Sequence, residues 1–307
     1  MGELSIGMAA PMPRDADVMR ARRIVEDIAS AGVDHLVVGD HVTFFGGFGI
    51  DGLVHATLLL AQHPDIEVHT SVYLLPLRHP VPVARQLSTI SSFAPGRLVL
   101  GVGIGGEDPH EVSSCGVDPR TRGRRMDECL QIVRGLQSDT AVTFSGEFFE
   151  LDEVSIDPAP SPAVPLVVGG RSSAAVRRAG RLGDGWLGIW VSPERFAEAV
   201  AEADQEAERV GRADVAWRHG MTVWCGFGDG RDEGAAVVAP VMEQIYRLPF
   251  DRFARYVPCG TPADVASALG AYVDAGCRSF NLLAHAADPA AVTPAVAQVR
   301  RILGMGA

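Results

Sequence analysis

The sequence predicts a single (β/α)8 barrel, and three observations lead to that fold. Apolar runs of strand length alternate with segments of helical periodicity along the chain, which favours a parallel sheet joined by helical crossovers. Eight such runs can be counted, which is the number that a closed barrel needs. The length of 307 residues exceeds the roughly 250 that this barrel typically takes. We therefore expect one domain over residues 1–307, with insertions between some of the barrel elements.

Each expected strand is a short apolar run with turn or loop residues after it. The eight runs lie near residues 4–8, 34–39, 66–74, 98–103, 165–169, 185–189, 217–225 and 279–283. Helices are expected over residues 17–30, 53–62, 82–93, 123–137, 172–182, 193–210, a stretch within 232–246, 262–275 and 289–302. Ser192 before Pro193 and Thr261 before Pro262 each place a capping hydroxyl ahead of a first-turn proline, which predicts where two of these helices begin.

Two segments interrupt the alternation of strands and helices. Residues 141–151, AVTFSGEFFEL, predict a β-hairpin that turns at Ser145-Gly146 outside the barrel. Residues 226–260 are glycine-rich at first and then helical, and they end in PFDRFARYVPCG. Because this insertion lies near the last two strands, we expect it to form a lid over the barrel mouth or a contact between subunits.

Composition and charge restrict the class of protein. With 47% hydrophobic and 21% charged residues the chain is an ordinary globular protein, and no apolar run approaches the roughly 18 to 20 residues of a membrane span. The N-terminus lacks the basic region and apolar core of a signal peptide, so we expect a cytoplasmic protein without a membrane partner. A net charge of −11 argues against a nucleic-acid partner, because its phosphates would be repelled.

The basic and sulfur-containing residues exclude several kinds of chemistry. All 27 basic residues are arginine, which excludes a Schiff-base lysine, a P-loop lysine and a lysine general base. The five cysteines are widely spaced and include no C-x-x-C pair, so we interpret them as reduced structural thiols. The chemistry must then use histidine, carboxylates, hydroxyls or a cofactor.

A glycine turn between the fifth strand and its helix predicts an anion site. In PLVVGGRSSAAVRRAGRLGDGW, residues 165–186, Gly169 and Gly170 let a ligand approach the backbone, and Ser172 can cap the following helix. Arg171 at the helix entrance favours phosphate, since the backbone N–H groups and the helix dipole point to the same spot. The alternative is that the glycines only form a tight turn.

Residues at the carboxyl ends of barrel strands are the first candidates for function. The second strand, DHLVVG, ends in Asp40-His41, which could form a general acid/base pair in which the carboxylate fixes the histidine tautomer. The alternative is a loop pair that makes local caps. His35, which lies earlier on the strand, is interpreted as a structural histidine.

The third and fourth strands carry unusual residues. Thr70 and Ser71 are polar within a run that should be buried, and such inconsistencies are often functional or strained. RLVLGVGIGG at 97–106 places Gly103 and Gly105 near a strand end, which we interpret as room for a flat ligand above the barrel mouth. The loop that follows carries Glu107, Asp108, His110 and Glu111, which favour a surface turn over a metal site; no metal is expected.

The order and spacing of these pieces resemble the luciferase-like monooxygenase superfamily of (β/α)8 barrels, whose members bind reduced flavin or the deazaflavin F420. The matching pieces are GDH at 39–41, HTSVYLLPLRHPVPVARQLSTISSFAPGRLVLGVGIGG at 69–106, RGRRMDECLQIVRGL at 122–136, SGEFFEL at 145–151, PLVVGGRSSAAVRRAGRLGDGWL at 165–187 and CGTPADVASALGAYVDAGCRSFNL at 259–282. They cover most of the chain, and residues 190–258 carry little of the resemblance.

The resemblance implies roles for individual residues. Asp40 and His41 match the acid-histidine pair of the F420-type members, and Ser71-Val72 matches a non-prolyl cis peptide behind the cofactor ring. His110 stands where many F420 members have asparagine, with one extra residue before it. The catalytic residues are then His41 and Asp40, and the expected cofactor-binding residues are Thr70, Ser71, Val72, Gly103, Gly105, His110, Gly169, Gly170, Arg171 and Ser172.

Two enzymatic functions follow from the resemblance. The first is an F420-dependent oxidoreductase that transfers a hydride between the deazaflavin and a small organic substrate, with His41 moving the accompanying proton. The second is a monooxygenase that takes reduced FMN from a separate reductase and must shield its reactive intermediate from water. A non-catalytic cofactor-binding protein would not need Asp40-His41, and a barrel metallohydrolase would need metal ligands at several strand ends.

Partners are expected from the same reasoning. The family commonly forms dimers, so we expect a homodimer, with a flavin or F420 reductase as a further partner. Aromatic residues near the strand ends indicate an apolar organic substrate; they are Phe44, Phe45, Phe48, Trp190 and Trp224.

Overall fold

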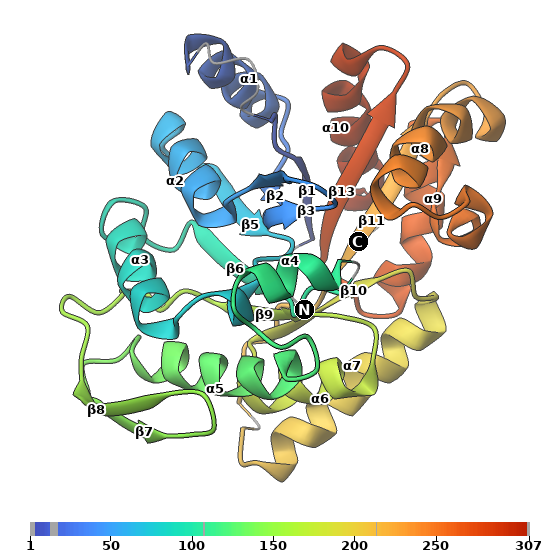
Figure 1. The fold of residues 1–307 in the computed structure, drawn as a ribbon. Helices are drawn as coiled ribbons and strands as arrows, with labels where there is room; N and C mark the ends of the chain where they lie inside the picture. Colours follow the sequence, from blue (N-terminus) through green and yellow to red (C-terminus); the bar gives the residue numbers. More distant parts are fainter. Residues whose placement is uncertain (1–3, 13–17, 107, 213, 306–307) are drawn as a thin grey trace.

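Eight parallel strands close on themselves to form the barrel (Figure 1). The computed structural model describes residues 4–12, 18–106, 108–212 and 214–305. The barrel strands are β1 (Ser5–Ala9), β2 (His35–Val38), β5 (Glu67–Thr70), β6 (Leu98–Val102), β9 (Leu166–Gly169), β10 (Gly185–Ile189), β11 (Gly220–Phe227) and β13 (Ser279–Ala286). They pair in this order, and β13 pairs in parallel with β1, so the first and last strands complete the ring. The predicted (β/α)8 barrel is confirmed.

Helices pack around the outside of the strands (Figure 1). They are α1 (Val18–Ser30), α2 (Gly52–Gln62), α3 (Pro80–Phe93), α5 (Arg122–Gly135), α6 (Ser173–Leu182), α7 (Pro193–Arg209), α8 (Arg231–Tyr246), α9 (Pro262–Asp274) and α10 (Val292–Gly304). Ser192 caps α7 by accepting a hydrogen bond from the Arg195 amide, and Thr261 and Asp264 form a reciprocal capping box on α9. Both predicted caps therefore set the starts of their helices.

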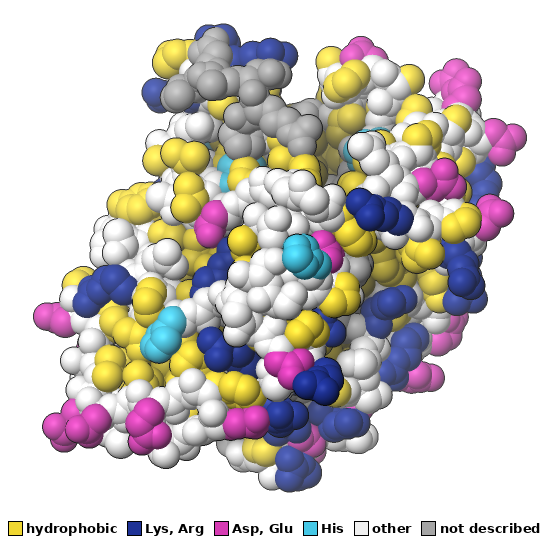
Figure 2. All heavy atoms as spheres, viewed as in Figure 1, with side chains coloured by type: hydrophobic (Ala, Val, Ile, Leu, Met, Phe, Trp, Pro, Cys, Tyr) yellow, Lys and Arg dark blue, Asp and Glu magenta, His cyan; other side chains and the backbone are white. Residues whose placement is uncertain are grey.

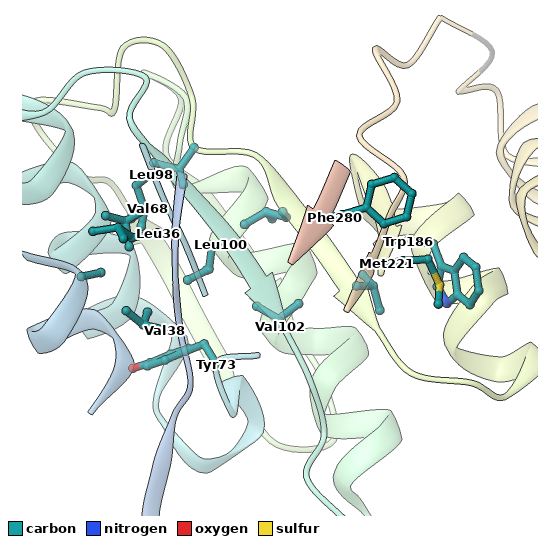
Figure 3. Packing of buried hydrophobic residues seen from close by; sticks show 14 of the residues in the cluster. Leu36, Val38, Val68, Tyr73, Leu98, Leu100, Val102, Trp186, Met221 and Phe280 are labelled. Carbon is teal, nitrogen blue, oxygen red and sulfur yellow. The ribbon is translucent and has the colours of Figure 1, made fainter. Parts of the chain in front are cut away.

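Alternate residues of each strand face the helices, because successive side chains of a strand point to opposite sides. Figure 3 shows Leu36 and Val38 of β2 and Leu98, Leu100 and Val102 of β6 among the buried side chains of this core. The apolar runs of the sequence thus bury one face of each strand against the helices. The intervening positions face the barrel interior.

The barrel interior contains buried histidines. His35 is fully buried, its ring stacks on that of His69 with centroids 3.7 Å apart, and its Nε2 bonds Asn281 Oδ1 at 2.8 Å. Gly7 leaves room for this ring, because a Cβ atom there would collide with it. His35 therefore has the satisfied, structural environment that the sequence indicates.

The buried histidines predict that the fold loses stability in mild acid. His219 is 8% exposed and accepts a hydrogen bond from the Trp186 amide at its Nδ1, and burial lowers its pKa to about 4. The unfolded chain binds this proton near pH 6.5, so unfolding is favoured as the pH falls from about 6.5 toward 4. Urea unfolding should show the free energy of unfolding falling by about 2 kcal/mol for this group between pH 7.5 and 5.

A matched variant identifies the source of that pH dependence. His219→Gln keeps an acceptor for the Trp186 amide but cannot titrate, so its free energy of unfolding should vary less between the two pH values. Equal pH dependence in the variant and the wild type would contradict this account. Burial also lowers the pKa of His35 well below its ordinary value. His35 therefore adds to the loss of stability in acid in both proteins.

Short elements that the sequence did not predict lie at the carboxyl ends of two strands. A hairpin of β3 (His41–Phe44) and β4 (Phe48–Ile50) follows β2, and the six-residue helix α4 (Pro109–Ser114) follows β6. The prediction of a surface turn after β6 was therefore wrong. The third barrel strand is also shorter than predicted, since it ends at Thr70 and continues only as an isolated bridge between Tyr73 and Val102.

Both insertions have regular structure. The hairpin consists of β7 (Val142–Ser145) and β8 (Glu150–Val154), an antiparallel pair separate from the barrel sheet. The segment 226–260 contains α8, two 3-10 turns and the short strand β12 (Cys259–Gly260), which pairs with β11. This segment thus extends from the carboxyl end of β11 and remains attached to the barrel edge.

The surface carries charges of both signs. On the face shown in Figure 2, basic side chains lie beside acidic ones. Ion pairs of the described chain include Arg124–Glu147 and Arg120–Asp118. Within the described ranges, no helix combines the length and apolar character that crossing a membrane requires.

Candidate functional site

A cleft of about 270 Å³ lies at the carboxyl ends of the barrel strands. Most of the residues that the sequence predicts for the site line it: Asp40, His41, Ser71, Val72, Gly103, Gly105, Gly169, Gly170 and Arg171. Thr70, Ser172 and His110 are not among its lining residues. A larger cavity, of about 610 Å³, lies at the amino ends of the strands. We take the cleft as the candidate active site, because chemistry in these barrels occurs at the carboxyl ends.

His41 is held by a glutamate that the sequence analysis did not select. Its Nδ1 lies 3.0 Å from Glu111 Oε2, and Oε1 of the same carboxylate accepts from the amides of Val42 at 2.6 Å and Thr43 at 3.1 Å. The Glu111 side chain is 3% exposed and that of His41 is 28% exposed. An ionised carboxylate at Nδ1 requires a proton on that nitrogen, which leaves Nε2 as the position that exchanges a proton with a ligand.

Asp40 does not serve as the tautomer-fixing partner of His41 that the sequence predicts. Its fully buried carboxylate accepts from Arg78 at 2.6 and 2.8 Å and from the amides of Gly52 and Leu74 at 2.9 and 2.8 Å. Burial raises the pKa of the Asp40 carboxyl, and the Arg78 cation opposes that rise. Asp40 therefore ties the loop after β2 to the starts of α2 and α3, and the predicted pairing is corrected to His41–Glu111.

The helix α4 explains why His110 is not in the cleft. Asp108 caps this helix by accepting from the His110 amide at 3.0 Å, and the His110 side chain is exposed beside Ser114. One residue further along, Glu111 is turned inward to His41. The pattern Asp108-Pro109, with an acid at the third helical position, was a signal for a capped helix that could have located Glu111. Glu107 lies outside the described residues, and the described chain holds no group of three potential metal ligands.

The polar residues at the end of the third barrel strand are satisfied by other strands of the barrel. Thr70 Oγ1 donates to the carbonyl of Gly101 at 2.7 Å, and Ser71 Oγ lies 2.8 Å from Thr222 Oγ1 on β11. The peptide bond Ser71-Val72 is cis, as the resemblance implied. The polar residues within an apolar run therefore mark an irregular strand end beneath the cleft. The role of Thr70 as a cofactor contact stays a prediction.

Two glycines make room for the side chain of Val72. A Cβ atom at Gly103 would collide with Val72 Cγ2, and one at Gly169 would lie 2.8 Å from Val72 Cγ1. From the sequence alone, this space was expected to hold a ligand. In the structure, the glycines let the Val72 side chain sit between two strand ends and form part of the cleft floor.

This packing predicts a coupled effect of two substitutions. Gly103→Ala should lower the free energy of unfolding by about 1–3 kcal/mol, as overpacking does, and adding Val72→Ala should restore part of it. Urea unfolding of the single and double variants measures both effects. Gly106→Ala is the matched control, since a Cβ atom there meets nothing within 4 Å. A loss in Gly103→Ala that Val72→Ala does not reduce would contradict the contact.

The predicted anion site has the expected backbone. Gly170 has a φ of +132°, and its carbonyl accepts from the Trp186 indole at 2.7 Å. Ser172 caps α6 by accepting from the Ala175 amide at 3.3 Å. The exposed Arg171 places its guanidinium 5.2 Å from the centre of the Trp190 ring. An arginine and a helix N-terminus at one edge of the cleft could hold a phosphate.

The segment 226–260 also borders the cleft. Ile245 and Tyr246 at the end of α8 line it, and the next residue, Arg247, reaches across to the β3–β4 hairpin. The Arg247 guanidinium lies 3.9 Å from the centre of the Phe45 ring and its Nη2 donates to the Phe45 carbonyl at 3.3 Å. The segment thus occupies the position of a lid; its function as a lid or a subunit contact stays a prediction.

Two relatives illustrate the similarity of this chain to known sequences. The uncharacterized protein Rv0940c of Mycobacterium tuberculosis is 36% identical over 163 residues, or 53% of this chain and 56% of that protein. The match thus spans little more than half the length of this relative. An F420-dependent glucose-6-phosphate dehydrogenase of Kineococcus radiotolerans is 27% identical over 273 residues, covering 80% of this chain and 81% of that protein.

Solved structures share the fold at lower identity. An F420-dependent secondary alcohol dehydrogenase in complex with an F420-acetone adduct has a TM-score of 0.82 and 20% identity, with 98% of both chains covered. The oxygenating constituent of 3,6-diketocamphane monooxygenase from Pseudomonas putida, in complex with FMN, has a TM-score of 0.77 and 16% identity, also covering 98% of both chains. These likenesses support the barrel fold.

A family model identifies the chain more specifically. The model described as luciferase-like monooxygenase matches residues 5–279, a span that includes His41, Glu111, the irregular strand end at Ser71-Val72 and the glycine turn before α6. The resemblance that the sequence indicates is therefore confirmed. The chain belongs to the luciferase-like monooxygenase family.

Proposed function

We propose that this enzyme is an F420-dependent oxidoreductase acting on a small organic substrate. The observation that carries the proposal is the pair His41–Glu111, which presents a histidine with a fixed tautomer to a cleft floored by Val72 and glycines. Hydride chemistry on an alcohol or carbonyl group needs such a residue, because a proton must move with the hydride. The relative named as an F420-dependent dehydrogenase supports the same proposal.

The residues present fit a flat, phosphorylated cofactor. Gly103 and Gly169 let Val72 lie at the floor of the cleft, where a flat ring could pack on it, and Arg171 with the N-terminus of α6 could hold a phosphate. When bound, a deazaflavin supplies the two-electron chemistry by exchanging a hydride with a substrate carbon. His41 Nε2 takes the hydroxyl proton of an alcohol, or returns a proton to a carbonyl oxygen in reverse. Glu111 keeps the imidazole oriented and stabilises its protonated form.

The alternative proposal is a monooxygenase that uses reduced FMN from a separate reductase. A solved structure of the same fold in complex with FMN supports this alternative. Such an enzyme requires a closed site, and the Arg247–Phe45 contact, which joins two segments that border the cleft, would serve that purpose as well. A proton-transfer residue with its own buried carboxylate favours hydride transfer. A homodimer remains part of the proposal for either function.

Titration of the purified protein with F420 and with FMN, each oxidised and reduced, tests the proposal. Fluorescence quenching should show tight binding of F420 and weak binding of FMN. Arg171→Ala should weaken F420 binding by about tenfold, since a charge-assisted bond to phosphate is lost. Arg177→Ala is the matched control, because this exposed arginine of the same helix pairs with Glu202. Tight binding of reduced FMN alone would support the monooxygenase, and binding of neither would overturn both functions.

A further inference from the structure

The cleft has an apolar wall that the proposed proton transfer does not use. It consists of Trp190 after β10, Ile245 and Tyr246 at the end of α8, and Leu283 of β13; we call these four residues the aromatic wall. The Tyr246 and Trp190 rings meet edge to face with centroids 4.7 Å apart. His41 lines the same cleft, so a molecule that reaches His41 also meets this wall.

The wall is held firmly from behind. Phe253 packs on both aromatic rings, with centroids 4.6 Å from Trp190 and 5.4 Å from Tyr246. The Trp224 indole donates to the Tyr246 hydroxyl at 3.1 Å. In that bond the Tyr246 hydroxyl is the acceptor, so the polar end of Tyr246 is anchored on Trp224 while Tyr246 lines the cleft. The wall therefore offers rigid aromatic and aliphatic area, which suits an apolar molecule.

Trp190 has an unusual conformation for a residue that only packs. Its φ is +51°, in the left-handed region that side chains rarely adopt, and its indole nitrogen is buried without an acceptor in the described chain. Both features cost free energy, and such costs are concentrated at functional sites. These two costs indicate that the fold holds the Trp190 ring at this place in the cleft for its function.

The charges around the cleft do not suit a second phosphate. Among its described lining residues, the one arginine is Arg171, which stacks on Trp190 and which the proposed function assigns to the cofactor. Arg78 beneath the cleft is bound to the carboxylates of Asp40 and Asp51. A buried phosphate dianion without a cation of its own is strongly disfavoured. Arg247 at the cleft edge is not a lining residue, and its guanidinium is held on the ring and the carbonyl of Phe45. The chain also has no lysine to supply a cation.

We infer that the substrate is a neutral alcohol or carbonyl compound with an apolar body, and that Trp190 and Tyr246 determine this specificity. The body packs on the aromatic wall while the oxygen faces His41. This inference rests on the proposed function and narrows it, because it excludes the phosphorylated sugar that the name of a relative would suggest. A substrate with a charged group would have to place that charge against the wall.

The test uses cyclohexanol and glucose 6-phosphate as probes. Turnover is followed by F420 absorbance, and binding is followed separately by saturation-transfer NMR with and without F420. The variants are Trp190→Ala, Trp190→Phe and Trp217→Ala. Trp217 is the matched control, since it stacks on His219 at the opposite end of the barrel with ring centroids 4.9 Å apart.

We expect cyclohexanol to bind and to be oxidised, with glucose 6-phosphate inactive. Trp190→Ala should raise the KM for cyclohexanol by about tenfold, with a smaller change in kcat, because the wall acts in binding and not in proton transfer. Trp190→Phe should restore most of the affinity, and Trp217→Ala should behave as the wild type. A KM that Trp190→Ala leaves unchanged, or turnover of glucose 6-phosphate at a lower KM than cyclohexanol, would overturn the inference.

The two proposals fail in different ways. If F420 does not bind, the proposed function fails, and NMR contact between cyclohexanol and the protein, lost in Trp190→Ala, still supports the wall. If F420 binds and glucose 6-phosphate is the better substrate, the proposed function stands and the inference about the substrate is wrong.

Discussion

Replacing His41 with asparagine should lower kcat for F420-linked turnover by about 10²- to 10⁴-fold, the usual contribution of a general acid or base. Asparagine can still donate to Glu111, so the loop after β2 should keep its conformation. F420 binding should change little, because the proton-transfer residue acts on the substrate oxygen and not on the phosphate site. Stopped-flow absorbance of F420 measures the turnover, and fluorescence quenching measures the affinity of each protein for the cofactor.

Neighbouring residues supply the controls for His41. Glu111→Gln keeps the length of the side chain but removes its charge, so kcat should fall by less than in His41→Asn and its dependence on pH should change. His110→Asn alters a histidine beside Glu111 that faces away from the cleft, and it should leave both turnover and F420 affinity unchanged. A loss in His110→Asn would restore the role that the sequence assigned to His110. Full activity in His41→Asn would remove the proposed mechanism.

The elements of the barrel could be predicted from the sequence because their signals are local. The strand at residues 185–189 is an apolar run. The starts of α7 and α9 are each indicated by Ser or Thr followed by proline. The glycine turn at Gly169-Gly170 and the polar misfit at Ser71 could be found for the same reason. Each of these features depends on a few consecutive residues.

The pairing of Asp40 and His41 with their partners could not be predicted from local signals, because the partners are distant in the sequence, although the capped helix that carries Glu111 has a local signal. Glu111 is 70 residues from His41, and Arg78 is 38 residues from Asp40. Adjacent residues of an irregular loop turn to different sides, so Asp40 and His41 share no partner. The space beside Gly103 was assigned to a ligand for a similar reason, since the side chain that fills it, Val72, comes from the neighbouring strand.

Replacing Asp40 with alanine should lower the free energy of unfolding by about 3–5 kcal/mol, the usual cost of breaking a buried ion pair by removing one partner. The substitution leaves the amides of Gly52 and Leu74 without their carboxylate acceptor, and it leaves the Arg78 guanidinium with the partly exposed Asp51 as its remaining carboxylate partner. Urea unfolding at pH 7.5 measures the change. Glu147→Ala is the control, because it breaks an equally short pair with Arg124 on the surface, where a pair contributes about 1 kcal/mol or less.

A second substitution separates the structural role of Asp40 from a catalytic one. In Asp40→Ala, adding Arg78→Met removes the cation that has lost its buried partner, so the double variant should regain part of the lost stability. If Asp40 instead took part in proton transfer, as its place beside His41 suggests, Asp40→Ala would lose activity at nearly unchanged stability, and Arg78→Met would not help. Because the carboxylate already accepts four hydrogen bonds from donors that hold the loop, the first outcome is the one that the geometry requires.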